Sequence, residues 1–272
     1  MSRLVGLVRL VHPAPTAAVV GLSLALATIL AAQAGGVAPW RIALTVAAVL
    51  GSQVATGALN DWADRERDAR VQPGKPIPAG LVTPSSALRL SLAGLALQVV
   101  ASLQLGPLPL ALGLAAVASA VGYNLWLSRT PLSVVPYLVS FGLLPLWIAA
   151  GIGVELERVA VAPLLVGPFA AAAHLANTLR DYAADAAVGS RNLAQLLGPH
   201  RGLAVAWGLA MGVGLGVGAG FLVAGDLHVP AAALGVAGLL AVAQGIAGPR
   251  RLWLGILVAA VAWTAAWALA SG

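Results

Sequence analysis

Residues 40–68 read WRIALTVAAVLGSQVATGALNDWADRERD. An apolar run of about 20 residues, enough to cross a hydrocarbon core of about 30 Å, leads directly into a segment of mixed acidic and basic side chains. The pattern predicts a membrane-spanning helix that ends in a polar segment. Asn60, Asp64 and Asp68 recur there every four residues and would share one face of a helix. Asp61 would lie about 100° away from that row.

The rest of the chain has the same apolar character. Of its 272 residues, 60% are hydrophobic and 9% are charged, and none is cysteine. Soluble domains have about a quarter charged residues, so the composition predicts an integral membrane protein. The lack of cysteine excludes disulfides, thiolate metal sites and cysteine nucleophiles.

Because a membrane helix satisfies its own backbone hydrogen bonds, the expected fold class is all-α: a polytopic bundle of about nine transmembrane helices. We expect one transmembrane domain over residues 1–272. The expected spans are 14–34, 40–60, 86–105, 107–127, 132–152, 160–181, 201–224, 229–247 and 251–270.

Basic residues are distributed unevenly about these spans. If the spans alternate in direction, all 15 Lys and Arg residues except Arg41 and Arg158 fall on the side of the N-terminus. The positive-inside rule then predicts a cytoplasmic N-terminus and an external C-terminus in the cell (plasma) membrane. The basic residues are not clustered with aromatic ones, so we expect no nucleic-acid partner. Abundant Arg, Ala and Gly are typical of a GC-rich bacterial genome.

A second acidic segment repeats the first. Asn177, Asp181 and Asp185 have the same four-residue spacing, 117 positions further on, and they end the sixth expected span. The repeat predicts two similar helical halves, and such repeats at membrane depth often bracket a binding site.

Carboxylates four residues apart on a helix repel one another, so each row needs a positive partner. Mg²⁺ takes oxygen ligands and often bridges carboxylates to substrate phosphates. Two rows facing each other would hold two such ions against a diphosphate. For a single row, pairing with the neighbouring Arg65, Arg67 or Arg180 is an equally good interpretation, but two matched rows favour the metal.

These residues resemble the UbiA superfamily of intramembrane prenyltransferases. Residues 60–68 match the family's first motif, N-D-x-x-D-x-x-x-D, and residues 181–185 match its second, D-x-x-x-D. Lys75 begins a K-P-I-P-A-G segment that stands where the family has a basic residue, Pro and a small–Gly pair, although Arg is more usual there. The segment from Tyr123 to Arg129 is similar to a third, looser signature. The likeness covers essentially the whole chain.

The resemblance implies an enzyme that moves a prenyl group from a prenyl diphosphate to an acceptor and uses Mg²⁺. Metals and arginines would stabilise the negative charge that grows on the leaving diphosphate. The implied metal ligands are Asn60, Asp64, Asp68, Asp181 and Asp185. The residues expected to contact the diphosphate are Arg65, Lys75, Arg129 and Arg191, with Arg129 the first choice. Further substrate-binding candidates are Asp61, Tyr123, Asn177, Arg9 and His174.

Several of these candidates also have simpler interpretations. Tyr123 lies at the cytoplasmic edge, where aromatic residues are common, although its ring could also face a carbocation. His174 lies about two turns deeper than Asp181; a satisfied interior histidine is one interpretation, and acceptor contact or proton removal is the other. Arg9 and His12 could bind an acidic acceptor, although Arg9 also contributes to topology.

Other functions fit parts of the pattern. A membrane terpene cyclase or a phosphoribosyl-type transferase would keep the same fold. A cation-coupled transporter would use the carboxylates as an ion site, but carboxylates confined to one membrane face count against it. No G-x-x-x-x-G-K-[ST] phosphate loop is present. Hydroxybenzoate, dihydroxynaphthoate, quinone precursors, porphyrins and lipid headgroups all fit as acceptors.

Overall fold

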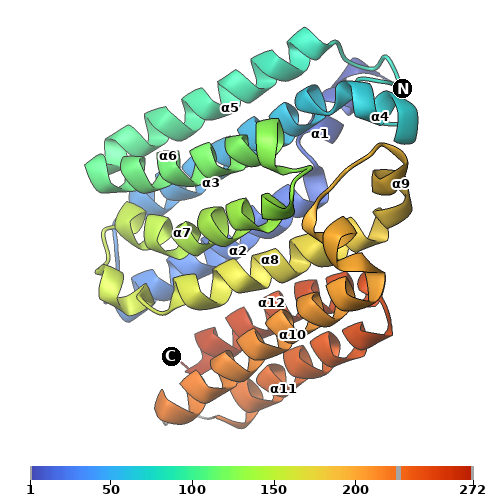
Figure 1. Cartoon of the computed structure of the whole chain (residues 1–272). Helices are drawn as coiled ribbons and strands as arrows, with labels where there is room; N and C mark the ends of the chain where they lie inside the picture. The colour runs from blue at the N-terminus through green and yellow to red at the C-terminus, as the bar shows by residue number, and fades with distance from the viewer. Residues whose placement is uncertain (1, 225–227, 271–272) are drawn as a thin grey trace. The chain divides into compact units, whose positions relative to one another are not determined.

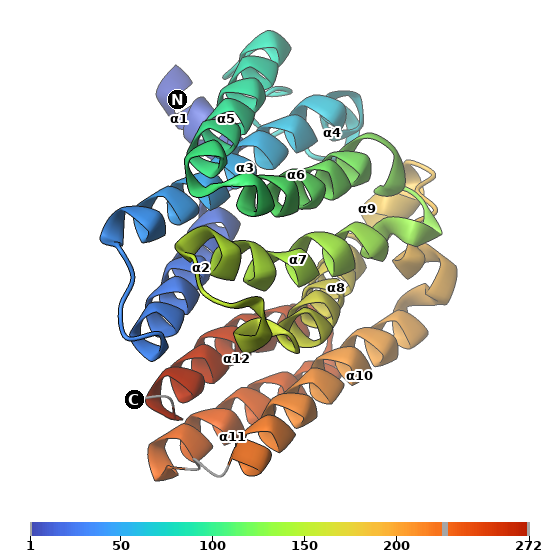
Figure 2. The ribbon, with the colours of Figure 1, turned by 90° about the vertical axis from the view of Figure 1, so that its left-hand side faces the viewer.

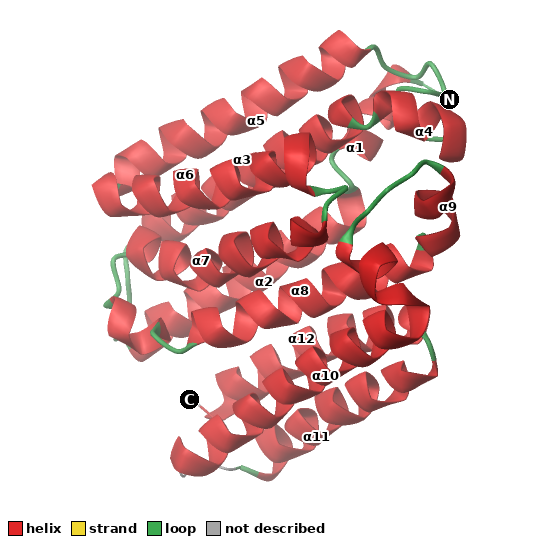
Figure 3. Cartoon of the chain, in the orientation of Figure 1, coloured by secondary structure: helices red, strands yellow, loops and turns green. Residues whose placement is uncertain are grey.

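The computed structural model describes residues 2–224 and 228–270. Within these ranges every regular element is a helix (Figure 1, Figure 3), so the all-α fold class is confirmed. The α-helices are α1 (Arg3–Leu10), α2 (Pro13–Gln33), α3 (Pro39–Ala63), α4 (Arg65–Val71), α5 (Pro84–Leu105), α6 (Pro107–Gly122), α7 (Val135–Ile152), α8 (Ala162–Arg180), α9 (Tyr182–Ala187), α10 (Leu193–Ala224), α11 (Val229–Ala243) and α12 (Pro249–Ala270). A π-turn, η1 (Tyr123–Leu127), follows α6, and short 3₁₀ turns are η2 (Pro131–Val134), η3 (Leu156–Val159) and η4 (Gln244–Ala247).

Nine helical segments in the described ranges are long and apolar enough to cross a membrane, so the nine expected spans are confirmed. Many of them begin with proline at the first helical position, where its missing N–H costs nothing. The largest departure is the seventh span, because α10 begins at Leu193 rather than at 201. The chain bends at Gly198, whose φ of 75° interrupts the helix just before Pro199.

The chain divides into two compact units, which are described separately. The first contains Met1–Ser128 and Leu143–Arg158, and the second contains Arg129–Gly142 and Val159–Gly272. Each unit therefore includes one of the two acidic segments.

Small residues bring the helices of the first unit into backbone contact. A Cβ added to Gly51 of α3 would lie 2.7 Å from the carbonyl oxygen of Gly94, and one added to Gly94 of α5 would lie 2.6 Å from the backbone nitrogen of Ala55. In lipid, helices associate through such close packing. The contact fixes α3, which carries the first acidic segment at its end.

In the second unit, α10, α11 and α12 lie side by side (Figure 1, Figure 2). Two tryptophans bind α11 from either side. Trp207 of α10 donates its indole N–H to the Ala243 carbonyl at 3.2 Å, and Trp263 of α12 donates to the Gly235 carbonyl at 3.1 Å. An indole N–H inside a protein usually has such a partner, and these two bonds connect α11 to both α10 and α12.

Candidate active site

The first acidic segment bends at Asp64. Helix α3 ends at Ala63, and Asp64, with φ −90° and ψ 3°, joins it to α4. The backbone N–H of Asp64 still donates to the Asn60 carbonyl at 2.9 Å, and that of Asp68 to the Asp64 carbonyl at 2.8 Å. The four-residue repeat is thus retained in the hydrogen bonds, although the row does not follow one straight helix.

The second acidic segment has the same break at the corresponding position. Helix α8 ends at Arg180, and Asp181, with φ −96° and ψ 11°, joins it to α9. The Asp185 N–H donates to the Asp181 carbonyl at 2.9 Å. The internal repeat seen in the sequence therefore extends to the backbone geometry.

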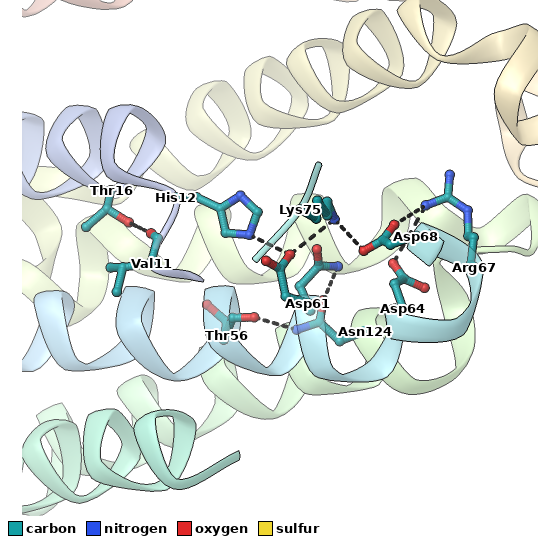
Figure 4. A network of polar contacts seen from close by, with 11 residues as sticks. Val11, His12, Thr16, Thr56, Asp61, Asp64, Arg67, Asp68, Lys75 and Asn124 are labelled. Carbon is teal, nitrogen blue, oxygen red and sulfur yellow. Dashed lines mark hydrogen bonds and ion pairs between the residues drawn. The ribbon is translucent and has the colours of Figure 1, made fainter. Parts of the chain in front are cut away.

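A lysine from the following loop joins two carboxylates of the first segment (Figure 4). Lys75 Nζ lies 3.1 Å from Asp61 Oδ1 and 2.8 Å from Asp68 Oδ2, and both aspartates are buried. Burial opposes the charge of Lys75, but the carboxylates of Asp61 and Asp68 outweigh it and raise the pKa of the ammonium group. Sequence reasoning assigned Lys75 to the diphosphate; the structure pairs it with the aspartates.

Arg67 supplies the second cation of this cluster. Its Nη1 lies 3.5 Å from Asp68 Oδ1 and 3.9 Å from Asp64 Oδ2 (Figure 4). Three carboxylates therefore face two cations. Burial raises the pKa of the Asp68 carboxyl, and the nearby charges of Asp64 and Asp61 add to this while Lys75 opposes it.

This cluster has the chemistry that a hard divalent cation requires. The atoms that would bind the metal are carboxylate oxygens, and Asp61 Oδ2 is buried without a hydrogen-bond partner in the described part of the chain. No group of three or more carboxylate or imidazole side chains there is already arranged to hold a metal ion, since Lys75 and Arg67 stand between them. The residues fit Mg²⁺ provided that these cations give way.

Asn60 is held by a second asparagine. Its Nδ2 donates to Asn124 Oδ1 at 3.2 Å, and Asn124 Nδ2 donates to the Thr56 carbonyl at 2.8 Å. Because the side-chain amide nitrogen of Asn60 makes this hydrogen bond, the side-chain oxygen Oδ1 is the atom suited to a metal. Asn124 lies in the π-turn that begins at Tyr123, and such turns often occur at functional sites.

Two other candidates of the first unit lie near the cluster but turn to different partners. Arg65 donates to the Trp62 carbonyl at 2.8 Å, contacts Glu66 at 3.4 Å and stacks over the Trp62 ring. Arg9 Nη2 donates to the Gly74 carbonyl at 2.8 Å, beside Lys75. Neither arginine makes these contacts with Asp61, Asp64 or Asp68.

In the second unit, a buried amide holds Asp185. Asn192 Nδ2 donates to Asp185 Oδ2 at 2.9 Å, while Asn192 Oδ1 accepts from the backbone N–H of Gln195 at 3.0 Å. Asn192 thus caps α10 and orients Asp185 together. Sequence reasoning missed this residue, although Asn followed three positions later by Gln before an apolar run is a helix-start signal.

The remaining candidates of the second unit are mostly exposed. Asp181, Asn177, Arg129 and Arg191 all lie at the surface. Asn177 accepts from Arg180 at 3.3 Å, and the Arg191 N–H donates to the Arg129 carbonyl at 3.1 Å. The structure therefore joins the backbones of two of the three arginines predicted to bind the diphosphate.

His174 lies deeper in α8 and is 4% exposed. Its ring stacks on Tyr137 of α7, with centroids 4.1 Å apart and planes 16° apart. Stacking inside the unit favours the interpretation of His174 as an interior histidine over direct proton transfer.

Replacing Asn192 by serine is expected to lower activity by about 10- to 100-fold, the usual cost of losing a residue that orients a metal ligand. Serine is also a good helix cap, so α10 keeps its cap, and the expected loss of stability is that of one hydrogen bond to a buried carboxylate, about 1–3 kcal/mol. Diphosphate release and thermal unfolding of the purified variant measure the two effects. Wild-type activity in Asn192→Ser would show that Asp185 needs no support from Asn192.

Residues 21–251 match the profile of the UbiA prenyltransferase family. A digeranylgeranylglyceryl phosphate synthase of Natronomonas pharaonis is 34% identical over 212 residues, 76% of this chain and 74% of that protein. A protoheme IX farnesyltransferase of Dinoroseobacter shibae is 40% identical over 119 residues, 41% of this chain and 38% of that protein.

The fold also matches a solved structure. A UbiA homolog from Archaeoglobus fulgidus, bound to GPP and Mg²⁺, has a TM-score of 0.73 and 16% identity, over 97% of this chain and 99% of that one. At that identity the likeness concerns the fold.

Proposed function

Because this chain belongs to the UbiA prenyltransferase family, we propose that it transfers a prenyl group from a prenyl diphosphate to a hydrophobic acceptor in a Mg²⁺-dependent reaction. The observation that carries the proposal is the pair of acidic segments, each bent at its middle aspartate at the end of an apolar helix. The Mg²⁺ and GPP bound by the Archaeoglobus fulgidus homolog support the choice of metal and donor.

Acidic residues of both units are proposed to bind the metal ions that hold the diphosphate of the donor. Asn60, Asp64 and Asp68 in the first unit, with Asp61 beside them, are the oxygen ligands for the metal there. Asp181 and Asp185 are the corresponding metal ligands in the second unit. Bound Mg²⁺ would neutralise charge on the leaving diphosphate.

Three basic side chains also stabilise the negative charge of the leaving diphosphate. Lys75, once the metal takes its place beside Asp61 and Asp68, binds diphosphate oxygens together with Arg129 and Arg191, because positive charge there stabilises the transition state more than the ground state. The allylic cation that forms as the C–O bond breaks must be kept away from water, and the apolar helices supply that environment. The Tyr123 ring, at the start of the π-turn, offers this cation a negative face.

The acceptor is proposed by class. The names of the two relatives point to different acceptors, a glycerophosphate lipid and a haem, and an aromatic ring or quinone precursor fits the same chemistry. A panel of such acceptors, each incubated with geranylgeranyl diphosphate with and without Mg²⁺, tests the proposal by the diphosphate released.

The same assay separates the other functions. A terpene cyclase would release diphosphate and form a cyclic product from the prenyl diphosphate alone. A cation-coupled transporter would carry ions across proteoliposomes and release no diphosphate.

We further propose that the protein spans the plasma membrane of a bacterium with its N-terminus and active site on the cytoplasmic side. Since the chain has no cysteine, single cysteines report topology without background. Arg70→Cys should be protected from an impermeant thiol reagent in intact cells, and Glu157→Cys should be labelled. The reverse pattern would contradict the orientation.

A further inference from the structure

We propose that α1 and the turn after it position the aspartates of the first acidic segment. His12 holds Asp61, and Arg9 holds the loop that carries Lys75. The inference rests on the proposed function, because it concerns how that site is prepared for a metal and a diphosphate. Arg9 and His12 are positioning residues here, since each acts through another group.

His12 has an unusual backbone conformation. Its φ of 51° and ψ of 70° are left-handed, and no other non-glycine residue in the described ranges has a positive φ. The residue before a proline, here Pro13, is normally extended. Such strain persists only where the surroundings hold it, and it clusters at functional sites.

The surroundings of this turn are closely fitted. Thr16 Oγ1 donates to the Val11 carbonyl at 2.6 Å (Figure 4). On the facing side, a Cβ added to Gly57 of α3 would lie 3.2 Å from the Leu10 carbonyl oxygen and 3.3 Å from His12 Cδ2. The turn therefore lies directly against α3, one helical turn before Asp61.

The strained turn directs the imidazole at one oxygen of Asp61. His12 Nε2 lies 3.1 Å from Asp61 Oδ1, the same oxygen that Lys75 contacts at 3.1 Å (Figure 4). The other oxygen, Oδ2, is buried and has no hydrogen-bond partner among the described residues. When Lys75 gives way to the metal, His12 still holds the carboxylate through Oδ1, so that Oδ2 remains for a cation. Outer partners orient metal-binding carboxylates in this way.

Helix α1 also holds the Lys75 loop. Arg9 Nη2 donates to the Gly74 carbonyl at 2.8 Å, next to Lys75. A Cβ added to Gly6 would lie 2.9 Å from Leu81 Cβ and 2.9 Å from Val82 Cγ1, so α1 packs against the end of the loop as well as its start. Lys75 is the residue between these two attachments that reaches the aspartates.

The test compares two variants of His12 in the full-length protein in detergent. His12→Leu removes the donor, whereas His12→Gln keeps an N–H at a similar reach, and both have an ordinary L side chain at the strained position. The dissociation constant for Mn²⁺ alone, measured by calorimetry or electron paramagnetic resonance, should rise about tenfold or more in His12→Leu. It should return close to the wild-type value in His12→Gln. His200→Leu, an exposed histidine of α10, is the matched control and should bind Mn²⁺ like the wild type.

A second variant tests the loop independently. Arg9→Gln is expected to raise the KM for the prenyl diphosphate by more than it lowers kcat, because Lys75 then reaches the diphosphate from a less firmly held loop.

Equal Mn²⁺ binding in His12→Leu and the wild type, or equal weakening in His12→Leu and His12→Gln, would overturn the role of His12. An unchanged KM in Arg9→Gln would overturn the role of Arg9. A wild-type protein that neither binds Mn²⁺ nor releases diphosphate would instead contradict the proposed function.

Discussion

Replacing Asp181 by asparagine is expected to slow diphosphate release by about 10³-fold or more. A metal ligand facing the leaving group contributes several kcal/mol to the transition state, and each 1.36 kcal/mol corresponds to a tenfold change in rate. Asp181 is exposed at the junction of α8 and α9. Because substitutions at exposed positions usually change stability by less than about 0.5 kcal/mol, the loss of rate will not reflect unfolding. Initial rates with saturating prenyl diphosphate and Mg²⁺ measure the effect.

The matched control is Glu66→Gln. It makes the same chemical change within the first acidic segment, but the Glu66 side chain is 85% exposed and contacts Arg65 rather than the cluster. We expect Glu66→Gln to retain activity within about twofold, because a solvated ion pair of this kind contributes little. Activity above a tenth of the wild-type rate in Asp181→Asn would remove Asp181 from the metal site.

Replacing Lys75 by methionine is expected to lower the free energy of unfolding by about 3–5 kcal/mol, the usual cost of leaving a buried partner charge uncompensated. The side chain of Lys75 is 20% exposed, while those of Asp61 and Asp68 are 2% and 1% exposed. Methionine keeps the length of the side chain but leaves two buried carboxylates without their ammonium partner. The melting temperature in detergent without divalent cations should fall accordingly.

Added Mg²⁺ should raise the melting temperature of Lys75→Met by more than that of the wild type, because the freed carboxylates gain a cation that binds the folded state. Arg70→Met, an exposed basic residue at the end of α4, is the control and should melt like the wild type. A Lys75→Met variant as stable as the wild type, or one that Mg²⁺ does not stabilise, would contradict the pairing of Lys75 with these aspartates.

The length of the apolar runs predicted the spans, and the spacing of the acidic residues predicted the repeat, because both depend on local sequence. Runs of apolar residues determine the nine spans found in the described ranges, and the four-residue spacing determines the acidic rows. The bends at Asp64 and Asp181 were not predicted, because the four-residue spacing is the same with or without a bend. At Asp64 the i to i−4 hydrogen bonds continue on both sides of the bend.

Contacts between residues far apart in the sequence could not be predicted. Lys75 was identified as a functional cation, but its side chain reaches back to Asp61, 14 positions away, and sequence does not reveal which charge it meets. The bond between His12 and Asp61 spans 49 positions and depends on a left-handed histidine. Propensity assigns that conformation to glycine, so only the packing of the turn against α3 accounts for it.

The most direct test of the central claim is the dependence of diphosphate release on Mg²⁺ in the wild type and Asp181→Asn proteins. Both are incubated with geranylgeranyl diphosphate and the best acceptor of the panel. Metal-assisted prenyl transfer predicts saturable release by the wild type, loss of release with a chelator, recovery with added Mg²⁺, and almost no release by Asp181→Asn at any Mg²⁺ concentration. Release that persists in the chelator, or that is equal in the two proteins, would contradict metal-assisted prenyl transfer at the two aspartate segments.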